Sequence, residues 1–216
     1  MPIAADTVEK VAVGGGGRRG PDAGDFRDGG GRGGSGRGRG VYRTGIWIAL
    51  APILMMFTAF SSAYIVRRGL GNDWQTLELP GILWLNTTLL AASSLTLEKA
   101  RACLARGLAP GFNRWWSVTT ALGVAFLLGQ LVAWWQLARS GVFLASNPSS
   151  SFFYLLTAAH GLHLLGGEVA LLYVASQAVR AGVAPARRTV VDVTAIYWHF
   201  LGGLWVFLFL LLLLWR

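Results

Sequence analysis

Five long apolar stretches follow one another along the chain after residue 44. They are residues 45–66, 81–97, 115–137, 151–178 and 190–215. As a helix, each can cross the hydrocarbon core of a bilayer at about 1.5 Å rise per residue. Within lipid only helices and closed barrels satisfy the backbone, and unbroken runs of this length favour helices over the short alternating strands of a barrel. The pattern predicts an all-α integral membrane bundle of five transmembrane helices.

Composition supports this prediction. Hydrophobic residues make up 54% of the 216 residues and charged residues only 13%, about half the usual charged share. Beyond residue 43 there are too few charges to coat a water-facing globule, which excludes a soluble catalytic domain. Cys103 is the single cysteine, which excludes a disulfide scaffold.

Residues 1–44 differ from the rest of the chain. Residues 1–40 contain 14 glycines, and such a segment buries too little apolar surface to offset its ordering entropy. We therefore expect two parts, a disordered Gly/Arg-rich cytoplasmic tail (1–44) and a transmembrane domain (45–216). The run at 31–40 is similar to RGG segments that bind nucleic acid by charge. No folded nucleic-acid module accompanies it, so a basic tail near anionic lipid headgroups is favoured, with no nucleic-acid partner.

The distribution of basic residues predicts the orientation. With the N-terminus in the cytoplasm, the inner segments carry 15 lysines and arginines and the outer segments carry four. Inner loops of membrane proteins are enriched in these residues. The C-terminus is therefore expected outside.

Ionisable side chains within the apolar stretches are candidate functional groups, because they are costly in hydrocarbon. The fourth stretch holds His160, His163 and Glu168, and the fifth holds Tyr197 and His199. The two histidines His160 and His199 fall at similar depth and could ligate one haem. The alternatives are hydrogen bonds between helices and contacts with a partner subunit or a lipid headgroup.

Small residues predict close helix packing in the same two stretches. These residues are Gly161, Gly166, Gly167, Gly202 and Gly203, with Gly123 and Gly129 in the third stretch. No phosphate loop, nucleophile elbow or cysteine-rich metal set is present in the sequence. Glu98, close to Lys99 and Arg101 at the end of the second stretch, is interpreted as a solvated helix end.

Several motifs occur in the order found in one known family. They are Tyr197-Trp198-His199-Phe200 and Leu204-Trp205, His160-Gly161-Leu162-His163, Leu85-Asn86-Thr87, and Gly129-Gln130. Together they make residues 45–215 resemble subunit III of the haem–copper cytochrome c oxidases, in its five-helix bacterial form. The family's buried, carbodiimide-reactive carboxylate is replaced by Ile53, so its role is not carried over. Glu168 stands where the mitochondrial form has a small residue.

The resemblance implies a non-catalytic subunit of a proton-pumping terminal oxidase in the bacterial inner membrane. It implies that haem and copper reside in subunits I and II, and that this chain packs on subunit I, binds structural phospholipid and supports proton uptake and turnover stability. Lipid-headgroup or inter-helix contacts are then expected of His160, His163, Tyr197 and His199, and phosphate contacts of Arg67 and Arg68.

Other functions remain open from the sequence. A quinol oxidase subunit III and a partner of nitric oxide reductase are the nearest alternatives. A b-type cytochrome anchor with His160 and His199 as haem ligands is more remote. A small secondary transporter is disfavoured, because five spans do not divide into equal inverted repeats.

Overall fold

Five α-helices make up almost all of the described part of the chain. The computed structural model describes residues 34–70, 74, 76, 78–144, 147–181 and 188–215. The helices are α1 (Gly34–Leu70), α2 (Ile82–Ala105), α3 (Ala109–Arg139), α4 (Pro148–Ala181) and α5 (Arg188–Leu214), and no strand occurs among the described residues. The predicted all-α, five-helix fold is confirmed.

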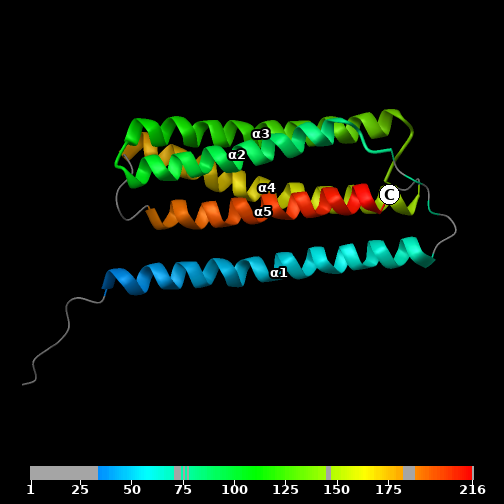
Figure 1. The fold of residues 1–216 in the computed structure, drawn as a ribbon, viewed down its shortest axis with the longest axis horizontal. Helices are drawn as coiled ribbons and strands as arrows, with labels where there is room; N and C mark the ends of the chain where they lie inside the picture. The colour runs from blue at the N-terminus through cyan, green and yellow to red at the C-terminus, as the bar shows by residue number, and fades with distance from the viewer. Residues whose placement is uncertain are drawn as a thin grey trace, which may run out of the picture. The chain divides into compact units, whose positions relative to one another are not determined.

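Helices α2 to α5 pack as a ring of four, drawn together in Figure 1. Helix α2 packs against α3 and α5, and α4 packs against the same two neighbours. Their shared core is apolar and fully buried; it includes Phe112, Phe126, Phe153, Leu164 and Leu201. Helix α1 reaches this group through side chains. The Tyr64 hydroxyl donates to the Trp215 carbonyl oxygen over 2.8 Å, and the Phe57 ring lies 5.8 Å from the His163 ring.

The four-helix group has an apolar exterior and a partly polar interior. Leu162 is 70% exposed and Val169 is 59% exposed, whereas Asn86 is fully buried and Glu168 is only 2% exposed. Large exposed apolar surfaces are unfavourable in water and favourable in lipid. The distribution of side chains is therefore that of a membrane protein.

Tryptophan N–H groups join the helices across this interior. Trp116 of α3 donates to the Leu171 carbonyl of α4 over 2.9 Å, and Trp134 of α3 donates to the Thr157 hydroxyl over 3.1 Å. Trp205 of α5 donates to the Thr87 hydroxyl of α2, also over 3.1 Å. A buried indole needs such an acceptor, since an unsatisfied donor costs about 1–3 kcal/mol. These bonds fix the rotation of each helix against its neighbour.

Within the described residues, four helices are long and apolar enough to cross a membrane: Thr44–Leu70, Ala109–Arg139, Pro148–Ala178 and Arg188–Leu214. Helix α2 is not among them, because polar and charged residues lower its mean hydropathy. Helix α1 begins at Gly34, so residues 34–44 of the expected tail form its first turns. Helix propagation from an established span adds one hydrogen bond per residue. Residues 1–33, the remainder of the expected tail, lie outside the described residues.

Candidate functional site

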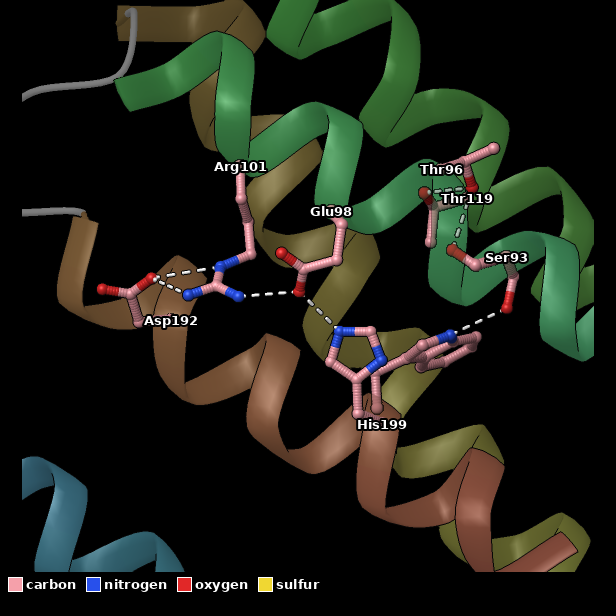
Figure 2. A network of polar contacts seen from close by, with 8 residues as sticks. Ser93, Thr96, Glu98, Arg101, Thr119, Asp192 and His199 are labelled. Carbon is pink, nitrogen blue, oxygen red and sulfur yellow. Dashed lines mark hydrogen bonds and ion pairs between the residues drawn. The ribbon is translucent and has the colours of Figure 1, made fainter. Parts of the chain in front are cut away.

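A chain of charged side chains links α2 to α5 near the end of α2 (Figure 2). Arg101 donates from Nε and Nη2 to Asp192 Oδ1, over 3.3 Å and 3.0 Å. Its Nη1 donates to Glu98 Oε1 over 2.7 Å, and the same oxygen lies 2.7 Å from His199 Nε2. Two residues of α2 and two of α5 thus form one network, called here the α2–α5 network.

The network has a definite pattern of charge. Because an ionised carboxylate only accepts hydrogen bonds, Nε2 of His199 carries the proton that it shares with Glu98. Hydrogen bonds from His199 and Arg101 to the same oxygen favour the ionised form of Glu98. The side chains of His199, Arg101, Glu98 and Asp192 remain 34%, 35%, 49% and 52% exposed. The network therefore lies on the surface of the bundle.

A second set of polar contacts continues from this network into the interior. Trp198, next to His199, is fully buried and donates from Nε1 to the Ser93 hydroxyl over 2.9 Å. One turn away, the Thr96 and Thr119 hydroxyls lie 2.8 Å apart and join α2 to α3. Consecutive residues of α5 thus bind two different levels of α2, one at the surface and one in the core.

An apolar groove lies beside the network on the same face. It has a volume of about 160 Å³ and is lined by Thr87, Leu90, Ala91, Ser94, Gly202, Gly203, Trp205 and Val206. Ser94 stands one turn before Glu98, and Gly203 one turn after His199. The groove and the α2–α5 network therefore form one continuous surface, called here the α2–α5 face.

Tyr197 and His163, predicted at the sequence level, meet between α5 and α4. The Tyr197 hydroxyl donates to the His163 carbonyl oxygen over 3.0 Å, while His163 Nδ1 lies 2.7 Å from the Ala159 carbonyl oxygen of its own helix. His160 lies elsewhere: it is fully buried, its ring nitrogens have no hydrogen-bond partner among the described residues, and its ring contacts those of Phe126 and Trp205. His160 therefore contacts neighbouring helices through aromatic rings, and not through hydrogen bonds to the described residues.

Arg67 and Arg68 lie in the last turn of α1, partly exposed. Their predicted phosphate contacts stay a prediction. No three or more His, Cys, Asp or Glu side chains come together as a metal-ion set in the described part of the chain.

The glycines predicted for packing differ in how closely they meet their neighbours. A Cβ at Gly167 would lie 3.1 Å from Tyr197 and 3.2 Å from Trp198, and one at Gly166 3.8 Å from the Tyr197 hydroxyl. At Gly202 the nearest atom would be Ser94 Oγ at 3.5 Å, and at Gly161 and Gly203 no heavy atom would lie within 4 Å.

The tightest contacts are at Gly123 and Gly129 of α3. A Cβ at Gly123 would overlap the carboxylate of Glu168, and one at Gly129 would overlap the side-chain amide of Asn86. Each glycine therefore makes room for a polar side chain of a neighbouring helix.

Sequence reasoning did not assign functions to Arg101 and Asp192 or connect Glu98 with His199. The spacing of Glu98 and Arg101 is a recognisable i,i+3 pair, so this part of the network was visible in the sequence. Glu98 is half exposed, as the interpretation of a solvated helix end expects, but it is also hydrogen-bonded to α5.

Comparisons with known proteins agree on one family. The sequence model of cytochrome c oxidase subunit III matches residues 43–216. A protein of Mycobacterium leprae named probable cytochrome c oxidase subunit 3 is 33% identical over 169 residues, which cover 77% of this chain and 83% of that protein. The cytochrome c oxidase subunit 3 of Corynebacterium diphtheriae is 32% identical, with 77% and 84% covered. That of Synechocystis is 29% identical, with 79% and 74% covered.

Proposed function

Because the chain belongs to the cytochrome c oxidase subunit III family, we propose that it is a non-catalytic subunit of a proton-pumping haem–copper terminal oxidase in a bacterial inner membrane. Its N-terminus lies in the cytoplasm and its C-terminus outside, as the distribution of basic residues favours. All five helices span the membrane. Haem and copper reside in subunits I and II, and this chain packs on subunit I, binds structural phospholipid, and supports proton uptake and stable turnover.

The α2–α5 face is the surface that we propose packs on subunit I. Its four charged or ionisable side chains are one-third to one-half exposed, next to an apolar groove. Charged groups facing lipid are costly, and they are less so where protein covers them. Ala91, Ser94, Gly202 and Gly203 line the groove with small side chains, which allow another helix to approach closely. We place a transmembrane helix of subunit I in this groove.

Substitution of Gly203 tests this placement without disturbing the bundle itself. A Cβ at Gly203 meets no heavy atom within 4 Å, and the same holds for Gly161 on α4. Gly203→Leu therefore fills the groove, and Gly161→Leu is the matched control outside it. We expect Gly203→Leu to insert into the membrane normally but to co-purify with less subunit I and II, and Gly161→Leu to retain both.

The purified complexes are compared by subunit stoichiometry and by oxygen consumption per haem over repeated turnovers. Full retention of subunits I and II by Gly203→Leu, with unchanged durability of turnover, would contradict packing through the α2–α5 face.

Phospholipid binding is proposed at the C-terminal end of α1. Arg67 and Arg68 are adjacent and partly exposed in its last turn, and two guanidinium groups suit a phosphate. Phosphorus assay of the purified complex should show less bound phospholipid in Arg67→Gln/Arg68→Gln. Arg139→Gln is the control, because Arg139 ends α3 and its guanidinium lies 3.7 Å from the Trp135 ring. Equal phosphorus contents in both variants would remove the assignment.

A further inference from the structure

Glu168 is the acidic side chain of α4, and its charge would find no compensation in the described structure. Its exposed fraction is 2%, and neither carboxyl oxygen has a hydrogen-bond partner among the described residues. It lies 20 residues after the start of α4 and 13 before its end, which is about 30 Å and 20 Å along the helix axis. It is therefore well inside the span.

The carboxyl group lies against the backbone of α3, close to an aromatic ring of α5. One carboxyl oxygen lies over the backbone of Gly123 in α3, where a Cβ would overlap it, and the edge of the Trp198 ring of α5 lies over the same glycine. The Trp198 N–H is engaged by the Ser93 hydroxyl. The backbone of one helix and the aromatic ring edge of another thus lie close to the carboxyl group, and neither offers it a hydrogen bond.

Among the residues that the structure describes, no cationic group of a neighbouring helix is paired with Glu168. Between Arg114 and Arg139, helix α3 has no charged residue. On α5, His199 and Asp192 belong to the α2–α5 network, and the Tyr197 hydroxyl is bound to the His163 carbonyl.

Neither α4 itself nor α1 supplies a partner for Glu168 within the described residues. His160 precedes Glu168 by eight residues, contacts aromatic rings, and has no hydrogen bond to it. Helix α1 contributes the Phe57 ring to His160 and His163, and has no charged residue between Thr44 and Val66.

An isolated carboxylate in such a place is far more costly to bury than the neutral acid, so the group keeps a proton instead of a charge. We propose that Glu168 is a proton-binding site inside the helix bundle, a neutral carboxylic acid that holds one proton at neutral pH. The ligand is the proton. The site is formed by the Glu168 carboxyl group, the backbone of Gly123, which has no side chain in the way, and the ring edge of Trp198. It is distinct from the α2–α5 face and does not depend on which subunit packs there.

Infrared difference spectroscopy of the purified complex at neutral pH tests the site. The spectrum of the wild type minus Glu168→Gln should contain the C=O stretching band of a carboxylic acid, which is separate from the bands of a carboxylate. Glu98→Gln is the matched control, because Glu98 is exposed, hydrogen-bonded and ionised. The wild type minus this variant should contain carboxylate bands alone.

Carboxylate bands in the Glu168→Gln difference spectrum would overturn the proposal. If this variant does not assemble, the wild-type chain labelled with ¹³C at the glutamate side-chain carboxyls gives the same information. The chain has four glutamates, Glu9, Glu78, Glu98 and Glu168, and only Glu168 should give an isotope-shifted acid band. Absence of such a band would also overturn the proposal.

Discussion

Gly123 allows the packing of α3 against α4 and α5 to be tested with a single methyl group. In Gly123→Ala the new Cβ would overlap Glu168 Oε2 and would lie 2.7 Å from Cη2 and 3.1 Å from Cζ2 of Trp198. Trp198 is fully buried and held by its bond to Ser93, so the ring has little freedom to move away. The substitution should therefore force the helices apart.

The expected magnitude combines two opposing effects. Adding a methyl group to a filled core costs about 1–3 kcal/mol. Because two buried groups resist it here, we expect the upper part of that range, about 2–3 kcal/mol. Replacing glycine by alanine in a helix returns about 1 kcal/mol of helix propensity. We expect a net loss of about 1–2 kcal/mol in the free energy of unfolding. In Gly203→Ala the new Cβ would meet no heavy atom within 4 Å. This variant should therefore gain stability from the higher helix propensity of alanine without any packing cost.

Unfolding in mixed micelles of a mild detergent and SDS, followed by circular dichroism, measures both variants under the same conditions. In a Glu168→Ala background the cost of Gly123→Ala should fall but not vanish, because the Trp198 contact remains. A Gly123→Ala protein as stable as the wild type, or a cost unaffected by Glu168→Ala, would refute the close approach of the carboxyl group to α3.

Two further predictions concern the contacts between α2 and its neighbours. Gly129→Ala should lower the free energy of unfolding by about 1–2 kcal/mol after the same gain in helix propensity, since its Cβ would lie 3.0 Å from Asn86 Cγ and 3.2 Å from Nδ2. Asn86→Ala should relieve the loss in the same unfolding assay. Trp198→Phe should cost about 1 kcal/mol through the lost bond to Ser93, in addition to the cost of the cavity that the smaller ring leaves. A double-mutant cycle with Ser93→Ala isolates the bond and should show that the two losses do not add.

The number and type of helices could be predicted from the sequence because apolar runs of sufficient length have one stable structure in lipid. The ends could not. Helix α3 begins at Ala109 where the apolar pattern begins at residue 115, and α1 begins at Gly34 where the pattern begins at residue 45. The apolar pattern marks only the part of a helix that lies in hydrocarbon, whereas backbone hydrogen bonding continues beyond it.

The site was only partly predictable for a different reason. His199 was recognisable as a costly polar group at membrane depth, but its partner Glu98 lies 101 residues away on another helix. No local pattern specifies that α2 and α5 are neighbours. The glycines were likewise recognisable as candidates for close helix packing. The sequence could not show that Gly123 and Gly129 pack more closely against their neighbours than Gly161 and Gly203 do. That ranking depends on which side chain of another helix faces each glycine.

Helix α2 has too low a mean hydropathy to be recognised as a membrane span, yet it packs with the other helices of the bundle. It is the helix that does not reach the hydropathy of a span by itself, yet its polar residues are directed into the bundle: Asn86 and Ser93 are fully buried. Ser93 accepts from Trp198 of α5, and Asn86 lies against Gly129 of α3. A polar side chain that meets a partner helix costs little in lipid and orients the helix that carries it. The polarity of α2 is therefore the reason that it can occupy its place between α3 and α5, and removing that polarity should weaken the packing even while it raises the hydropathy.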